Sequence, residues 1–130
     1  MTDKKKSMLV IDDDKDLCRI LKDIFGAKGY EVEAVYNGFV AVELAKKKKF
    51  DIVLIDLVMD GKNGIEAMEE IQKLDPDTSC FMMTAYPNDP LFEEGKTNGD
   101  LVIFKKPLDF EGLPEIFDKK IAENKKGKNK

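Results

Sequence analysis

The sequence predicts an α/β fold: a doubly wound, five-stranded parallel sheet built from five successive strand–helix units. Four short runs of consecutive apolar residues are typical of strands that are buried on both faces. Between these runs, apolar residues recur at helical spacing. Because crossovers between parallel strands are almost always right-handed, this alternation predicts one sheet with helices on both faces.

The five predicted strands differ in their pattern of burial. Residues 30–36 alternate apolar side chains with Glu31 and Glu33, which is typical of an edge strand. The other four strands are continuously apolar, as expected inside a parallel sheet, and they cover residues 8–11, 52–55, 80–83 and 101–104.

Helical patterns and their stop signals fill the gaps between the strands. Asp14 is the expected N-cap of the first helix, because aspartate readily accepts a hydrogen bond from a free backbone amide. Pro114 is expected to disturb the first turns of the last helix or to delay its start. The predicted helices cover approximately residues 17–25, 37–45, 65–74, 89–98 and 110–121.

The length of 130 residues suits one domain with a sizeable core, and the sequence contains no internal repeat. We expect residues 1–6 to form a flexible N-terminus and residues 7–123 to form the domain. The lysine-rich residues 124–130 lack apolar side chains, so we expect a disordered basic tail there. The residues after Lys106 are too few for a helix-turn-helix module, so we expect none within this sequence.

The composition excludes several classes of function. The chain has no histidine, which excludes Ser-His-Asp catalysis and His-ligated metal sites. Acidic residues outnumber basic ones by 26 to 22, and Arg19 is the single arginine, which argues against nucleic-acid binding by this domain. The apolar runs are too short to cross a membrane. Cys18 and Cys80 form no C-x-x-C pair, so we expect a reducing, cytoplasmic environment.

Polar residues follow each of the four buried strands. In open α/β sheets, ligands bind outside the carboxyl ends of the strands. The predicted fold therefore gathers carboxylates, a hydroxyl group and an ammonium group at one edge. These residues are Asp12-Asp13-Asp14, Asp56, Thr84 and Lys105-Lys106-Pro107.

Several carboxylates at one edge repel each other, and a purely structural role does not explain this cost. A Mg²⁺ ion prefers such oxygen ligands and would relieve the repulsion. A carboxylate can also act as a nucleophile and form an aspartyl phosphate. A metal ion, a lysine and a hydroxyl group would neutralise the charge that develops on the transferring group. The residues therefore predict phosphoryl transfer onto an aspartate.

The same residues resemble the four signatures of a response-regulator receiver domain over about residues 7–122. The first strand with its acidic pair matches, as does the segment that begins at Asp56 and reaches its glycine at Gly64. Thr84-Ala85 and Lys106-Pro107 resemble the two remaining signatures. Thr84 follows Asp56 by 28 residues and Lys106 follows Thr84 by 22, which suits the family.

The resemblance implies a flavodoxin-like strand order of 2-1-3-4-5 and a specific site. Asp56 would be the phosphorylated residue, and with Thr84 and Lys106 it would carry the chemistry. The phosphoryl group would be held by Thr84, the Ala85 amide and Lys106. Lys106 would pair with the Asp56 carboxylate before transfer, and the Lys106-Pro107 bond would be cis. Asp13 would ligate Mg²⁺ directly and Asp12 mostly through water, and Asp56 and the backbone carbonyl of Val58 would complete the ligand set.

The resemblance also implies a signalling module rather than a conventional enzyme. It would catalyse its own phosphorylation and a slow dephosphorylation. Because this chain has no histidine, the phosphoryl donor would be a partner, either a sensor histidine kinase or a histidine phosphotransferase. A downstream protein would bind the face formed by the fourth helix, the fifth strand and the fifth helix. Val58 and Tyr86 occupy positions that often control water access to the phosphoryl group in this family.

Two residues depart from the family's pattern. Ile103 stands where the family usually has an aromatic switch residue, and Phe104 should face the opposite side of the sheet. Movement of Thr84 would then couple to the surface differently or weakly. Asp60 stands where the family often has proline, which predicts a more mobile or more acidic loop after Asp56.

Three alternative functions remain open at the level of sequence. A haloacid-dehalogenase-type phosphatase would use Asp12 and Asp14, but the fifth position of its signature holds Asp16 here instead of Thr or Val. A flavin site would need a phosphate-binding loop after the first strand, where three aspartates would repel phosphate. A phosphorylation-independent interaction domain is the third alternative.

Overall fold

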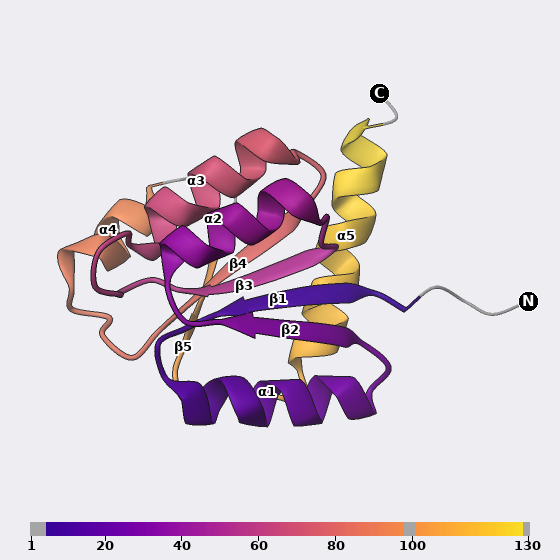
Figure 1. The fold of residues 1–130 in the computed structure, drawn as a ribbon, viewed down its shortest axis with the longest axis horizontal. Helices are drawn as coiled ribbons and strands as arrows, with labels where there is room; N and C mark the ends of the chain where they lie inside the picture. The colour runs from indigo at the N-terminus through magenta and orange to yellow at the C-terminus, as the bar shows by residue number, and fades with distance from the viewer. Residues whose placement is uncertain (1–4, 98–100, 129–130) are drawn as a thin grey trace, which may run out of the picture.

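The computed structural model describes residues 5–97 and 101–128 of the chain (Figure 1). Its five parallel strands form one sheet in the order β2-β1-β3-β4-β5, which confirms the predicted fold class and strand order. The strands are β1 (Ser7–Ile11), β2 (Glu31–Val35), β3 (Ile52–Asp56), β4 (Ser79–Thr84) and β5 (Val102–Lys105).

Five helices cover the two faces of the sheet. Helices α2, α3 and α4 lie on one face and α1 and α5 on the other, as the ribbon in Figure 1 and the two core clusters show. Their bounds are α1 (Lys15–Ala27), α2 (Gly38–Lys47), α3 (Gly64–Leu74), α4 (Pro90–Lys96) and α5 (Leu113–Lys128).

The core is divided by the sheet into two layers. Along β1, Leu9 and Ile11 pack towards α2 and α3, whereas Met8 and Val10 pack towards α1 and α5. Successive side chains of a strand point to opposite faces, so a strand covered on both sides needs apolar residues at every position. This explains why the apolar runs of the sequence are continuous.

Side-chain caps fix where the helices begin. Asp14 accepts a hydrogen bond from the Leu17 amide, which confirms the predicted cap of α1. The start of α3 has a capping box, in which Asn63 and Glu66 each accept a hydrogen bond from the other's backbone amide. Helix α5 begins at Leu113, so Pro114 lies in its first turn, where a missing amide costs no helical hydrogen bond.

The two ends of the domain differ from the sequence expectation. Lys6, in the segment expected to be flexible, forms an ion pair of 2.6 Å with Asp118 of α5, while residues 1–4 lie outside the described residues. Helix α5 continues to Lys128, so residues 124–128 are helical rather than disordered. Extending a formed helix needs no new nucleus, and the Asn124 side chain donates a 2.7 Å hydrogen bond to Ser79 Oγ. Residues 129–130 of the expected tail are not described.

Phe117 connects α5 to the sheet, because its fully buried ring lies 4.7 Å from the ring of Phe81 and 5.7 Å from that of Phe25. We expect Phe117→Ala to lower the free energy of unfolding by about 3–5 kcal/mol, measured by urea denaturation. Ile116→Ala, at the neighbouring exposed position, should cost less than about 1 kcal/mol. Equal losses for the two variants would contradict this assignment of the core.

Candidate functional site

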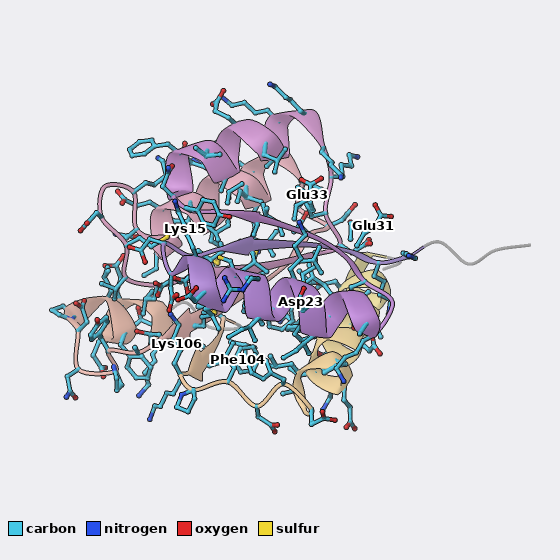
Figure 2. The ribbon with its side chains drawn as sticks, turned by 60° about the horizontal axis from the view of Figure 1, so that its bottom comes forward. Lys15, Asp23, Glu31, Glu33, Phe104 and Lys106 are labelled. Atoms are coloured by element: carbon cyan, nitrogen blue, oxygen red, sulfur yellow. The ribbon has the colours of Figure 1, made fainter. Side chains whose placement is uncertain are left out.

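The polar residues predicted at the strand ends surround one pocket of about 390 Å³ at the carboxyl edge of the sheet. Strands β1 and β3 are neighbours, so the segments that follow them meet there. In Figure 2, Lys106 lies close to the first turn of α1, at the same end of the sheet as Lys15. The pocket is lined by Asp12, Asp13, Asp14, Asp56, Val58, Met59, Asp60, Ala85, Tyr86 and Lys106.

Asp12 is fully buried, and both of its carboxylate oxygens are engaged. One oxygen accepts a 2.9 Å hydrogen bond from the Asp14 amide, and the other accepts a 2.8 Å hydrogen bond from Lys106 Nζ. The Cys18 thiol donates to the Asp12 carbonyl over 3.3 Å. Asp12 is therefore held in a fixed orientation. Sequence reasoning missed the contribution of Cys18, because its spacing in α1 indicated only a core position.

Asp56 is the last residue of β3, and only 5% of its surface is exposed. One carboxylate oxygen accepts a long 3.4 Å hydrogen bond from the Val58 amide, and the other lies 3.7 Å from Lys106 Nζ. Burial and the nearby charge of Asp12 raise the pKa of Asp56 to about 7, although the ammonium group of Lys106 acts in the opposite direction.

Asp13 completes a group of three carboxylates. Its side chain is exposed, and partial burial together with the charge of Asp12 raises the pKa of Asp13 above its ordinary value. One oxygen from each of Asp12, Asp13 and Asp56 lies within 4.8 Å of the others. Three hard oxygen donors at this separation, on an edge with one lysine, fit a divalent cation such as Mg²⁺.

Lys106 lies between the two buried carboxylates. Burial lowers the pKa of Lys106, but the hydrogen bond to Asp12 and the charges of Asp56 and Asp12 outweigh it, so the net shift is upwards. The ammonium group is closer to Asp12 than to Asp56, at 2.8 Å against 3.7 Å, whereas the sequence predicted a pair with Asp56. The Lys106 amide donates to the Thr84 carbonyl over 2.8 Å, and the Lys106-Pro107 bond is cis, as predicted.

Thr84 and Ala85 occupy different environments. Thr84 ends β4 and is fully buried, and its hydroxyl oxygen accepts a 2.9 Å hydrogen bond from the Tyr86 amide. Ala85 and Tyr86 line the pocket. The hydroxyl group of Thr84 is therefore engaged within its own loop, close behind the pocket wall.

The loop after Asp56 is fixed by backbone contacts at Gly64. The Gly64 amide donates to the Leu57 carbonyl over 3.0 Å, and the Leu57 amide donates to the Met83 carbonyl over 2.8 Å. A Cβ atom at position 64 would lie 2.5 Å from the carbonyl oxygen of Asp56. Only glycine permits this close approach, which holds the start of α3 against the end of β3.

The two cysteines are buried thiols, as predicted. Burial raises the pKa of Cys18 to about 11 and that of Cys80 to about 12, so both thiols are protonated at neutral pH. Cys80 borders a second pocket of about 310 Å³ between α3, β4 and α5, which Met68, Gln72 and Asn124 also line. Thiol chemistry is therefore not favoured at either pocket.

The fold and this pocket define a class of protein: a domain that accepts a phosphoryl group on a carboxylate at the carboxyl edge of a doubly wound sheet. The family model of the response regulator receiver domain matches residues 8–118, and the chain belongs to this family. It is therefore a phosphoacceptor receiver module of two-component systems, a class of signalling modules that interact with histidine kinases or phosphotransferases.

Two proteins with similar sequences are a transcriptional regulatory protein and a chemotaxis protein. The chain is 35% identical over 122 residues to the transcriptional regulatory protein ZraR of Klebsiella oxytoca, covering 94% of this chain and 28% of ZraR. It thus spans little more than a quarter of that relative's length. It is also 35% identical over 115 residues to the chemotaxis protein CheY of Thermotoga maritima, covering 88% of this chain and 96% of CheY.

A solved structure has the same fold over nearly its whole length. The CheY-like receiver domain protein from Methanospirillum hungatei superposes with a TM-score of 0.86 at 26% identity, covering 95% of this chain and 99% of that one. The haloacid-dehalogenase alternative would use Asp12 and Asp14, and the match of residues 8–118 to the receiver family does not favour it. Among the described residues, no helix has the length and apolarity needed to span a bilayer.

The crowding of Asp12, Asp13 and Asp56 predicts a cost to folding in the absence of metal. The pKa of Asp56 in the folded chain, about 7, lies above the value of about 3.9 for an unfolded aspartate. This group therefore favours folding below about pH 4, and that contribution is lost as the pH rises through 7. We expect Asp56→Asn to raise the Tm of the metal-free protein at pH 8 by about 4 °C or more, and much less at pH 4.

Differential scanning calorimetry at the two pH values measures this difference. Asp23→Asn, which makes the same change at an exposed aspartate within α1, serves as the matched control and should leave the Tm nearly unchanged at both. A lower Tm for Asp56→Asn at pH 8 would contradict the picture of mutually repelling carboxylates.

Proposed function

We propose that Asp56 is the phosphoryl acceptor of this receiver domain. The observation that carries the proposal is the difference between the two buried carboxylates. Both oxygens of Asp12 accept short hydrogen bonds, whereas Asp56 has one long contact with the Val58 amide and a lysine at 3.7 Å. When one Asp56 oxygen forms a bond to phosphorus, few stabilising hydrogen bonds of this carboxylate therefore have to break.

The transfer that we propose is a displacement at phosphorus. An ionised oxygen of Asp56 forms the new O–P bond, the N–P bond of the partner's phosphohistidine breaks, and the imidazole of the partner leaves with its electron pair. Because the pKa of Asp56 is about 7, both the ionised and the protonated forms are present near neutral pH, and the ionised form is the nucleophile. Self-catalysed phosphorylation by small donors follows from the same chemistry.

The other residues of the pocket would stabilise the transferred group. Lys106 is close enough to exchange Asp12 for a phosphoryl oxygen, and the Ala85 amide and the Thr84 hydroxyl would hold the remaining oxygens after a change in the 84–86 loop. Mg²⁺, when bound, would supply charge neutralisation for the phosphoryl oxygens. Its proposed ligands are the carboxylates of Asp12, Asp13 and Asp56 and the carbonyl of Val58.

Acetyl phosphate tests the acceptor directly. Asp56→Asn should abolish Mg²⁺-dependent labelling, because an amide cannot form the acyl phosphate, and intact-protein mass spectrometry would measure the loss of the phosphoryl adduct. Asp60→Asn, a change at an exposed aspartate of the same pocket, should retain labelling. Labelling that survives in Asp56→Asn would refute the assignment.

Slow self-dephosphorylation is also proposed, because Val58 and Tyr86 line the pocket and neither side chain positions a water molecule well. Tyr86→Ala should accelerate the loss of label by opening a path for water. Tyr36→Ala, which changes an exposed tyrosine outside the pocket lining, should not. Rapid loss of label from the unmodified protein without a phosphatase would count against this proposal.

The output surface is proposed to be the face formed by α4, β5 and α5. Ile103 packs on the side of α2, α3 and α4, and Phe104 packs on the other side against Phe81, as the sequence predicted. A Cβ atom added at Gly95 would lie 2.8 Å from Ile103, so α4 rests closely on an aliphatic side chain. We propose that Thr84 acts on this face through a shift of α4 over Ile103 rather than through an aromatic ring.

A cytoplasmic location is proposed as well. Cys18 and Cys80 are both unbridged buried thiols, which suits a reducing compartment.

A further inference from the structure

Exposed aromatic side chains collect at one edge of the domain. Among the described residues with large, exposed apolar side chains, three are aromatic: Tyr36, Phe39 and Tyr86. Tyr36 and Phe39 follow the carboxyl end of β2, and Tyr86 follows that of β4. All three therefore lie on the edge of the sheet that carries Asp56, on both sides of the pocket in strand order.

Tyr36, Phe39 and the adjacent exposed Val40 lie together at the start of α2, and we call these three residues the α2 corner. Their exposed fractions are 43%, 58% and 47%, although Ala41 and Val42, the next two residues of α2, are buried in the core. Single exposed apolar side chains are common on protein surfaces, but a contiguous group is more typical of a binding site. Packing within the domain does not explain the α2 corner.

The rings of the α2 corner are held in place despite their exposure. Lys62 Nζ lies 5.0 Å from the centre of the Phe39 ring, and Lys15 Nζ lies 5.1 Å from that of Tyr36. A Cβ atom at Gly61 would come within 3.0 Å of the Phe39 ring, so the ring rests on the backbone there. A side chain that is already ordered loses little entropy when a partner covers it, which is a property of interface anchors.

The residues that support the α2 corner directly follow two segments of the pocket lining, the one after β1 and the one after β3. Lys15 directly follows the three aspartates after β1, and Gly61 and Lys62 directly follow Asp60 of the pocket lining. Figure 1 shows the start of α2 beside the loop that leads from β3 to α3. A protein that brings a phosphorylated side chain to the nearly buried Asp56 must cover the mouth of the pocket, and these loops continue from that mouth to the α2 corner.

We propose that the α2 corner is a docking surface for the phosphohistidine-bearing protein that phosphorylates Asp56, with Phe39 as its main anchor. This inference rests on the proposed function. The partner would present an apolar helical face, and acidic residues around that face would suit the ammonium group of Lys15. Lys62 is already paired with Glu70, so it serves to support the Phe39 ring. Three side chains are too few for a stable dimer but suit the small interface of a transient transfer complex.

Phosphotransfer kinetics test the docking surface. The histidine kinases and histidine phosphotransferases of the source organism would be purified, phosphorylated and screened individually, and the fastest donor to the unmodified protein would be used. Phe39→Ala and Val40→Ala should each raise the KM for this donor, Phe39→Ala by about 10-fold or more, with kcat nearly unchanged. Labelling by acetyl phosphate, which needs no docking, should stay at the unmodified rate.

Leu74→Ala provides the matched control, because Leu74 is 45% exposed at the far end of α3 and away from the pocket. It should change neither rate. An unchanged KM for Phe39→Ala, an equal loss with acetyl phosphate, or an absence of transfer from every donor would overturn the docking proposal. A dimer that depends on Phe39 in sedimentation experiments would also overturn it. Failure of acetyl phosphate to label the unmodified protein would instead refute the acceptor function itself.

Discussion

The hydrogen bond between Lys106 and Asp12 is the interaction on which the site depends. Asp12 is fully buried, and a buried carboxylate is costly unless a charged partner and further hydrogen bonds compensate for its lost hydration. Lys106, which directly follows β5, supplies that compensation, and the Asp14 amide adds a second donor from the start of α1. The bond therefore connects distant parts of the chain and leaves Asp56 beside it with weaker contacts, which supports the proposal that Asp56 is the acceptor.

The site combines crowded charge with a rigid support. The five strands are covered on both faces, so their ends cannot move apart to relieve the repulsion between the carboxylates. Gly64 adds to this constraint, because it allows α3 to begin directly against the Asp56 carbonyl. The packing of the core offsets the free-energy cost of crowding the three carboxylates at this edge. A cation that binds there meets carboxylate oxygens that are already grouped, whereas the proposed phosphoryl contacts of Thr84 and Ala85 need a change in the 84–86 loop.

Two surfaces extend from this site in different directions. The α2 corner continues from the loops after β1 and β3, whereas the face of α4 and β5 is connected through the loop after Thr84. The first is rich in fixed aromatic side chains. The second rests on the contact between Gly95 and Ile103 and carries Phe92, whose ring centre lies 5.3 Å from Lys96 Nζ and 5.7 Å from Lys105 Nζ. The proposed input and output faces are separate, so one partner could replace another without the two competing for the same residues.

The sequence by itself determined the fold class, the strand order through family resemblance, the N-cap at Asp14 and the identity of the residues at the carboxyl edge. The fold class, the N-cap and the strand-end residues follow from local patterns, because apolar periodicity and strand-end chemistry are properties of neighbouring residues. Only the tertiary structure decided that Lys106 bonds to Asp12 more closely than to Asp56, that the Thr84 hydroxyl is engaged by the Tyr86 amide, and that α5 extends to Lys128. It also decided that Phe39 stays exposed. The Lys106–Asp12 bond joins residues 94 positions apart, and the other features depend on the backbone geometry and packing around them, neither of which the residue pattern encodes.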